Sequence, residues 1–395
     1  MTFLLILLFA VAIVGGGLAW FTVRTARKVE AALPPAGRFV DVPGARLHLV
    51  ERGQGPALLL VHGLAGQLGH FTYGIVDRLA AEYRVVAVDR PGSGYSLRSP
   101  GASAALGAQA DVLAALIDKL QLGRPVVAGH SLGGAVALAL AQRHPERVAG
   151  LALVAPLTHM VDSVSAAFKG LEISTPWVRA LVAWTLAVPA SIARRDEILA
   201  LVFGPEPVPR DYGTRGGGLL ALRPSQFIAA STDLAAIAED LPGMMQRYGT
   251  MRLPVSILYG RGDRILDPHQ QGEALATELP GAQLTLIDGG HMLPVTAPER
   301  TAQFIRDAAI RAGVTPRQVE DGLSASAVSG HASSHPGGRR LRCARAATAI
   351  AGAPIAAAAV RAAEEKGHAE CDQQERADEV EYADGDEAQV LRDAE

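Results

Sequence analysis

Three side chains in this sequence have the types and the order that nucleophilic catalysis requires. The first is Ser131, at the centre of the pentapeptide GHSLG between the apolar run 125–129 and a strongly helix-forming stretch. In a nucleophile elbow a serine occupies a sharp strand-to-helix turn, and flanking glycines let strand and helix approach closely. The pentapeptide alone is a weak signal, but the strand before it and the helix after it favour a nucleophile over an ordinary helix-capping serine.

A serine hydroxyl is a weak nucleophile, so it needs a base and a residue that orients the base. The apolar run 255–260 leads into a loop with Asp263, and catalytic groups of open α/β sheets gather beyond the carboxyl ends of strands. Asp267 is the alternative acid, although it also fits the N-cap of the following helix, and we favour Asp263. His291 follows the run 284–288 on the next loop, where its ring can take the serine proton while the acid holds its tautomer.

Two backbone N–H groups are expected to stabilise the oxyanion that forms when the serine attacks. One belongs to Leu64, on the loop after the apolar run 57–61, and the other to Leu132, directly after the nucleophile. Loss of one such donor typically costs ~3 kcal/mol of transition-state stabilisation. The loop 88–96 also follows a strand, and we assign it no chemistry beyond shaping the floor near the site. His130, beside the serine, is expected to point its side chain elsewhere.

The elements around these residues alternate between short apolar runs and helical stretches. Continuous apolar strands are buried on both faces, which is typical of a parallel sheet, and interleaved helices indicate βαβ units. Residues 38–52 instead alternate like two antiparallel strands around a Pro-Gly turn. The sequence therefore predicts an α/β fold with a mostly parallel central sheet and helices on both faces. The apolar runs are 57–61, 84–89, 125–129, 151–155, 255–260 and 284–288.

The alternation stops between residues 156 and 253, and this stretch is predicted to be a helical cap inserted over the sheet. Trp177 and Trp184 stand seven residues apart, on one face of a helix. We interpret them as the core of the cap, with direct substrate contact as the alternative. The apolar composition of 177–193 indicates a pocket lined by aliphatic and aromatic side chains.

The first residues form a candidate membrane anchor. No residue from Phe3 to Val23 is charged, and about 20 apolar residues in a helix cross the hydrocarbon core of a bilayer. A cleaved signal peptide is the alternative, but no Lys or Arg precedes the run, and Trp20 lies where an interfacial aromatic residue would. Because positive residues follow the run immediately, we expect a single-pass protein of the cell membrane with its catalytic domain in the cytoplasm.

Composition excludes several classes of protein. Hydrophobic residues make up 49% of the chain and charged residues 19%, which excludes global disorder and provides a large core. The formal net charge of −3 gives no basic field that would favour nucleic acid as a partner. Cys343 and Cys371 are the only cysteines and lie beyond the candidate triad, which excludes a disulfide scaffold and a cysteine-based zinc site or nucleophile there. We expect neither a metal nor a cofactor.

Five motifs together resemble the α/β-hydrolase superfamily, and most closely its single-domain bacterial esterases with a helical cap. They are HGLAG, DRPGSGYS, GHSLGG, GRGDRILDP and GGHMLPVTAPE, and the resemblance covers residues 38–312. It implies a triad of Ser131, Asp263 and His291, with Leu64 and Leu132 at the oxyanion hole. Haloalkane dehalogenases and epoxide hydrolases of this superfamily use an aspartate where this chain has Ser131, so both activities are disfavoured.

These patterns predict an anchor, a linker, a two-part hydrolase core interrupted by the cap, and a disordered tail that is rich in Ala and Arg and then acidic. The predicted bounds are 1–23 for the anchor, 24–37 for the linker, 38–156 and 253–312 for the core, 157–252 for the cap and 313–395 for the tail.

The leading prediction is a serine hydrolase that cleaves carboxylic esters of apolar or medium-chain acyl groups through an acyl-enzyme. Its partners would be a small apolar ester and the membrane. Carbon–carbon bond hydrolases of ring-fission products, thioesterases and perhydrolases share the same triad and remain alternatives. A hypothesis from another class is a non-catalytic, membrane-bound binding protein that has kept the fold.

Overall fold

A nine-stranded sheet forms the centre of the computed structural model, which describes residues 1–317. Along the sheet the strands follow the order β1-β2-β4-β3-β6-β7-β8-β9, and the short β5 pairs with β2. The strands are β1 Arg38–Val42, β2 Ala45–Arg52, β3 Ala57–Val61, β4 Arg84–Val88, β5 Leu97–Arg98, β6 Val126–His130, β7 Gly150–Val154, β8 Val255–Gly260 and β9 Gln283–Ile287.

The sheet is mostly parallel, as predicted. β2 pairs antiparallel with β1 and with β4, whereas β4, β3, β6, β7, β8 and β9 run parallel to one another. The strands β3, β6, β7 and β8 are buried along their whole length, because helices cover both faces of the sheet. The carboxyl ends of β6, β8 and β9 consequently lie at the same edge, where loops can bring catalytic groups together.

Two hydrophobic clusters divide the core between the two faces. Alternate strand residues such as Leu59 and Val127 belong to one cluster, with residues of α4 and α5, while Leu58 and Val126 belong to the other, with α3 and α12. The helices are α1 Thr2–Ala32, α2 Gly69–Thr72, α3 Val76–Ala80, α4 Leu106–Lys119, α5 Leu132–Arg143, α6 Pro176–Trp184, α7 Ala187–Ala193, α8 Arg195–Phe203, α9 Pro224–Met245, α10 Ala274–Glu278, α11 Leu293–Thr296 and α12 Pro298–Arg311.

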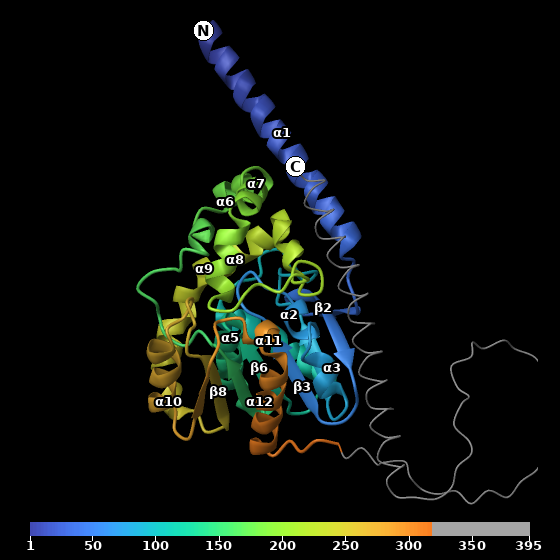
Figure 1. Ribbon diagram of the computed structural model, residues 1–395, viewed down its shortest axis with the longest axis vertical. Helices are drawn as coiled ribbons and strands as arrows, with labels where there is room; N and C mark the ends of the chain where they lie inside the picture. The colour runs from blue at the N-terminus through green and yellow to red at the C-terminus, as the bar shows by residue number, and fades with distance from the viewer. Residues whose placement is uncertain (318–395) are drawn as a thin grey trace, which may run out of the picture. The chain divides into compact units, whose positions relative to one another are not determined.

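Short helical turns connect several of these elements. They are the 3₁₀ turns η1 Pro145–Arg147, η2 Lys169–Leu171, η3 Gly218–Leu222 and η4 Tyr248–Thr250, and the π-helical turn η5 His269–Glu273. Helices α6 to α9 all come from the segment between β7 and β8 and lie above the sheet (Figure 1). This is the predicted helical insertion, and we propose the bounds 157–252 for it, with the core over 38–156 and 253–312.

The two tryptophans of the insertion are not part of its core. In α6 Trp177 is 69% exposed and Trp184 is 46% exposed, so the interpretation as cap core is wrong. The buried face of α6 instead carries Ala183 and Arg179, whose guanidinium donates to Ser231 Oγ on α9 at 2.9 Å. The seven-residue spacing correctly placed both tryptophans on one face of α6, but that face is exposed and does not form the core of the cap.

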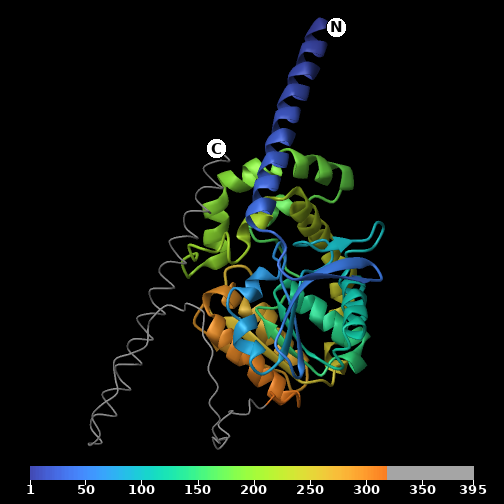
Figure 2. The same cartoon turned by 90° about the vertical axis from the view of Figure 1, so that its right-hand side faces the viewer.

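The first helix is longer than the apolar run that predicted it. α1 continues to Ala32, so most of the predicted linker 24–37 is helical. Its exposed N-terminal part extends away from the cap, while Thr22, Thr25 and Val29 are buried against it (Figures 1 and 2). Within residues 1–317, α1 is the one unbroken helix long and apolar enough to cross a membrane. The predicted disordered tail lies, from residue 318 onwards, outside the described residues.

Candidate active site

Ser131 lies at a strained turn between strand β6 and helix α5. Its backbone adopts φ 53° and ψ −122°, a combination that costs a non-glycine residue free energy and that clusters at functional sites. The Ser131 N–H donates to the carbonyl of Val154 at 3.0 Å, and its carbonyl accepts from Gly134 N at 2.8 Å and Leu157 N at 3.0 Å. The neighbouring strand β7 and the first turn of α5 therefore hold the serine in this conformation.

The glycines around Ser131 are required by close approach. A Cβ atom at Gly129 would lie 2.5 Å from the carbonyl oxygen of Gly133, and one at Gly133 would lie 2.2 Å from that of Val61. Either substitution would force the helix away from the sheet. The spacing that suggested an elbow in the sequence thus has a direct steric basis.

Asp263 and His291 form a buried hydrogen-bonded pair. The distance between Asp263 Oδ2 and His291 Nδ1 is 2.8 Å, and the two side chains are 0% and 4% exposed. The other carboxylate oxygen, Oδ1, accepts from the backbone N–H groups of Ile265 at 2.8 Å and Leu266 at 3.0 Å. Because all these bonds fix the carboxylate, it can hold the ring of His291 with Nδ1 protonated and Nε2 free for a proton.

Asp267 has a different environment. Its Oδ1 accepts from the backbone N–H of His269 at 2.9 Å, at the start of η5, in the manner of a helix cap. Its side chain makes no hydrogen bond with His291, whose carboxylate partner is Asp263. This geometry favours Asp263 as the orienting acid.

His130 connects the nucleophile loop to the histidine loop. Its Nε2 lies 3.0 Å from the carbonyl oxygen of His291, and the centroids of the two rings are 4.9 Å apart. This bond directs the His130 side chain towards the loop after β9 and positions the backbone of His291. Ser131 and His291 themselves share no hydrogen bond in this conformation. In enzymes without substrate, catalytic hydrogen bonds are often long and shorten on binding.

Three histidines around the site are kept neutral. Burial and then the positive charge of Arg90 lower the pKa of His62 well below its ordinary value, and burial followed by His291 and His70 does the same to the pKa of His130. Burial and the charge of His291 lower the pKa of His70 to about 4. Because these neighbours carry no charge near neutral pH, none of them adds a fixed positive charge beside the site.

The expected oxyanion donors line one cavity with the serine. This cavity has a volume of about 160 Å³, and Leu64, Ser131 and Leu132 are among the residues that line it. Leu132 is the first residue of α5, where backbone N–H groups have no partner within the helix. The positive end of the helix dipole also lies there, so the site can stabilise negative charge that develops on a substrate oxygen.

Arg90 holds the loop that carries Leu64, a role that sequence reasoning missed. Its fully buried guanidinium donates to the carbonyl oxygens of His62 and Gly63, both at 2.9 Å, and to Gln109 Oε1 at 2.8 Å. It also pairs with Asp233 of the cap helix α9 at 2.6 Å. The loop 88–96 thus does more than shape the floor of the site. The available signal was the charged pair Asp89 and Arg90 directly after the apolar residues of β4.

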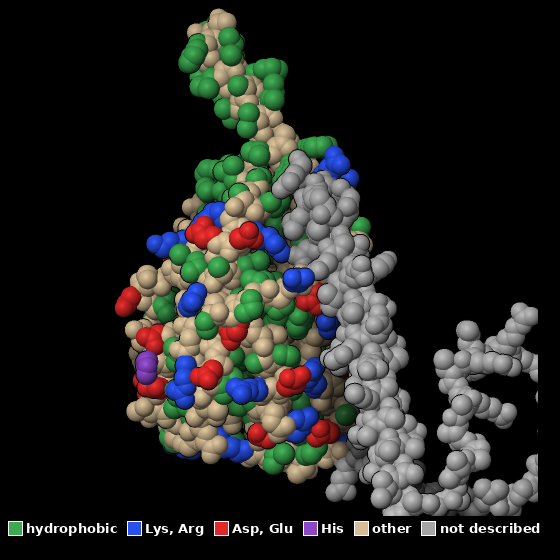
Figure 3. Space-filling view, viewed as in Figure 1, with side chains coloured by type: hydrophobic (Ala, Val, Ile, Leu, Met, Phe, Trp, Pro, Cys, Tyr) green, Lys and Arg blue, Asp and Glu red, His purple; other side chains and the backbone are tan. Residues whose placement is uncertain are grey.

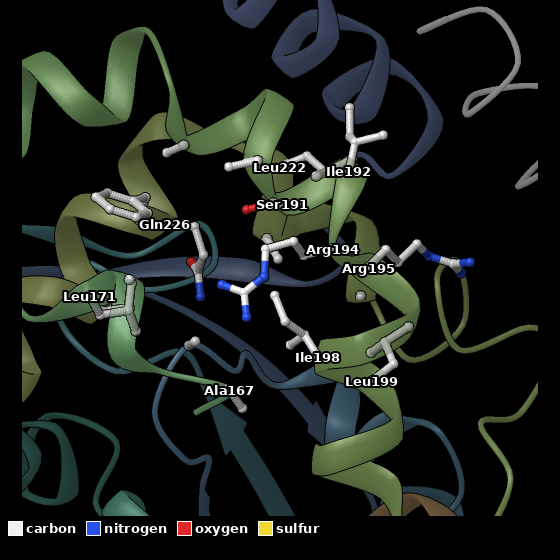
Figure 4. A pocket seen from close by; sticks show the side chains of 18 of the residues that line it. Ala167, Leu171, Ser191, Ile192, Arg194, Arg195, Ile198, Leu199, Leu222 and Gln226 are labelled. Atoms are coloured by element: carbon white, nitrogen blue, oxygen red, sulfur yellow. The ribbon is translucent and has the colours of Figure 1, made fainter. Parts of the chain in front are cut away.

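A second cavity of about 340 Å³ lies beneath the cap helices α6 to α9. Phe168 lines both cavities, so they adjoin. Aliphatic and aromatic side chains make up most of the second lining, as the composition of the insertion predicted. Figure 4 shows Arg194 pointing into this cavity and Arg195 pointing away from it. The Arg194 guanidinium, which is paired with the Glu197 carboxylate at 2.9 Å, adds a charged group to a lining that is otherwise mostly apolar.

Comparison with known proteins identifies the family. Residues 56–298 match the family described as the alpha/beta hydrolase fold. The match covers more than half of the sequence, and the order of the strands agrees with it. The chain therefore belongs to the α/β hydrolase fold family and is a hydrolase.

Three similar proteins illustrate the range of this family. An uncharacterised protein of Mycobacterium tuberculosis is 30% identical over 69% of this chain and 80% of its own length. Haloalkane dehalogenase 2 of the same species is 28% identical over 69% of this chain and 94% of its own length. The solved structure of a bacterial membrane phospholipase A, described as a virulence factor, is 27% identical, covers 79% of this chain and 99% of its own, and has a TM-score of 0.56.

Proposed function

We propose that this protein is a serine hydrolase that cleaves carboxylic esters of apolar or medium-chain acyl groups. The observation that carries the proposal is the 2.8 Å bond between Asp263 and His291, in a site whose serine stands at positive φ in a strand-to-helix turn. A serine at the position where dehalogenases of the superfamily use an aspartate argues against carbon–halogen cleavage.

The proposed reaction has two steps. In the first, His291 Nε2 accepts the proton of Ser131 as its Oγ attacks the ester carbonyl, and Asp263 stabilises the resulting imidazolium. The N–H groups of Leu64 and Leu132 bind the oxyanion, and the leaving alcohol takes the proton from His291. In the second step water attacks the acyl-enzyme by the same route in reverse order, and the carboxylic acid and Ser131 are released.

The apolar cavities support an acyl group as the main recognition element. Of the residues beside Ser131, Leu157, Leu234 and Leu241 present aliphatic side chains, and the adjoining cavity of about 340 Å³ extends this apolar volume under the cap. Similarity to a membrane phospholipase A points in the same direction, because that protein is named for acting on an acyl ester.

A series of p-nitrophenyl esters from acetyl to dodecanoyl tests the acyl preference. We expect kcat/KM to rise with chain length through the medium chains, because each buried methylene adds about 0.8 kcal/mol of favourable transfer free energy. Ser131→Ala is the matched control and should hydrolyse every ester of the series about 10⁴-fold more slowly or worse. A profile that peaks at acetyl and falls with every added methylene would contradict an apolar acyl site, as would turnover confined to thioesters.

We further propose that α1 anchors the protein in the cell membrane and that residues 24–395 face the cytoplasm. Support comes from the mean hydropathy of 2.5 over the apolar window of α1, from its exposure, and from the positive residues Arg24 and Arg27 directly after it. Protease added to intact spheroplasts should leave the hydrolase domain uncut. Digestion of the domain from outside would mean that the protein has the opposite orientation. Release of a form lacking α1 would indicate a signal peptide.

A further inference from the structure

We propose that the outer face of the cap lies in the surface of the bilayer and that the substrate enters the active site from the membrane. This face, the apolar patch, consists of Trp177, Leu181, Trp184 and Leu186. The proposal rests on the proposed ester hydrolysis and on α1 as an anchor. The apolar patch would contact a phospholipid bilayer, and the acyl esters of that bilayer would be the substrate class.

All four side chains of the apolar patch are exposed. The exposed fractions are 69% for Trp177, 56% for Leu181, 46% for Trp184 and 54% for Leu186. Helices α6 and α7, bent by 59° at their junction, are together apolar enough for a broken membrane span or a re-entrant loop. A contiguous apolar face of this kind normally contacts a partner or a membrane.

The position of α1 indicates that the apolar patch contacts a membrane. α1 contacts α6, α7 and η3, and Val29 packs in one hydrophobic cluster with Val188 and Leu219 of the cap. The Glu30 carboxylate pairs with Arg223 at 2.9 Å on the same side. The anchor and the cap are therefore joined, and where the exposed part of α1 enters a bilayer, α6 and α7 lie beside the point of entry (Figures 1 and 2).

The surface around this point has the composition of a membrane interface. Hydrophobic side chains gather on the cap at the base of the protruding helix (Figure 3). Trp20 of α1 and Trp177 and Trp184 of α6 are all exposed and lie on two helices that contact each other, and tryptophan is enriched at the level of lipid headgroups. The guanidinium of Arg24 lies 5.5 Å from the ring of Trp20, which places a positive charge at the same level. A positive charge at this level attracts the headgroups of anionic lipids.

The apolar patch is continuous with the cavity beneath the cap. Leu186 is part of the exposed face and also lines the cavity of about 340 Å³, together with Val182, Ala187 and Ala190 from the same two helices. An acyl chain leaving the bilayer at α6 and α7 would thus stay in contact with apolar side chains on its way towards Ser131. On this route the acyl chain avoids the free-energy cost of exposing its apolar surface to water.

Quenching of tryptophan fluorescence tests the proposal, because the chain has only three tryptophans. The full chain is incorporated into vesicles of phosphatidylcholine and phosphatidylglycerol with bromines on the acyl chains near the headgroup. Trp20→Phe leaves Trp177 and Trp184 as reporters of the cap, and the double variant Trp177→Phe, Trp184→Phe leaves Trp20 as the reporter of the anchor. We expect brominated lipid to quench both reporters. Quenching of Trp20 without quenching of the cap tryptophans would overturn the proposal while leaving the anchor intact. Absence of quenching for both reporters would overturn the proposal and the anchor together.

A functional variant tests entry from the membrane in the same vesicles. Trp177→Ser with Leu181→Ser should reduce hydrolysis of a vesicle-embedded acyl ester about ten-fold, because less apolar surface is buried in the interface. Hydrolysis of soluble p-nitrophenyl butyrate should stay nearly unchanged, which excludes misfolding. The matched control is Ile310→Ser on α12, a similarly exposed residue distant in the sequence. Trp177→Leu should retain the activity on vesicles. An equal loss on both substrates, or no loss on vesicles, would contradict membrane entry.

Discussion

Ser131→Ala should lower kcat by about 10⁴-fold or more, since the variant keeps the oxyanion donors but has no oxygen with which to form an acyl-enzyme. His291→Ala should cause a similar loss, because within residues 1–317 His291 is the one side chain of the site that pairs with Asp263 and can accept the serine proton. The double variant should be little worse than either single variant, since the two residues act as one unit. Steady-state kinetics with the preferred p-nitrophenyl ester measures all three.

The two aspartates of the loop after β8 supply the internal control for this series. Asp263→Asn should retain more activity than Ser131→Ala, because the ring of His291 can still accept a proton when it adopts the correct tautomer. Asp267→Asn should leave kcat nearly intact and cost about 1 kcal/mol of stability as a lost cap. A strong loss of kcat in Asp267→Asn beside an active Asp263→Asn would mean that the acid has been assigned to the wrong residue.

Asp233→Asn should be among the most destabilising single changes in the protein. The carboxylate is buried and pairs with Arg90, which is itself fully buried, and with the partly buried Arg98. Its loss leaves the guanidinium of Arg90 without a counter-charge, and breaking a buried pair in this way typically costs about 3–5 kcal/mol. We expect the melting temperature to fall by roughly 10 °C. Thermal unfolding of the full chain by near-ultraviolet circular dichroism measures this shift.

An exposed ion pair provides the comparison. Asp118 pairs with Arg147 at the surface, and Asp118→Asn should change stability by less than about 1 kcal/mol. Asp233→Asn should also lower kcat, because Arg90 holds the carbonyl groups of the loop that carries Leu64. A melting temperature within a degree of the unchanged protein would show that the buried pair contributes nothing net to the fold.

Local patterns were sufficient to predict the sheet and the placement of most candidate site residues. Each depends on signals within a few residues, such as the apolar run of β6 followed by glycines around Ser131. The preference for Asp263 over Asp267 likewise used local signals, which were the place of Asp263 just beyond the end of β8 and the fit of Asp267 to a helix N-cap. The order of strands then brings the loops after β6, β8 and β9 to one edge of the sheet without any further information.

Contacts between distant segments could not be read in the same way. Arg90 and Asp233 are 143 positions apart, and neither residue type indicates the other in the sequence. Trp177 and Trp184 share a helical face, but periodicity does not show whether protein, water or lipid covers that face. The extension of α1 to Ala32 was missed because its buried stripe of Thr22, Thr25 and Val29 is short and mostly weakly apolar.

Covalent labelling with a fluorophosphonate tests the central claim of a nucleophilic Ser131 most directly. The reagent phosphonylates a serine only where a base activates it and an oxyanion site stabilises the adduct. Peptide mass spectrometry of the labelled full chain should find one modification, on Ser131, and His291→Ala should abolish the labelling while Asp267→Asn retains it. A folded protein that takes up no label, or one that is labelled equally well after Ser131→Ala, would contradict the assignment of Ser131 as the nucleophile.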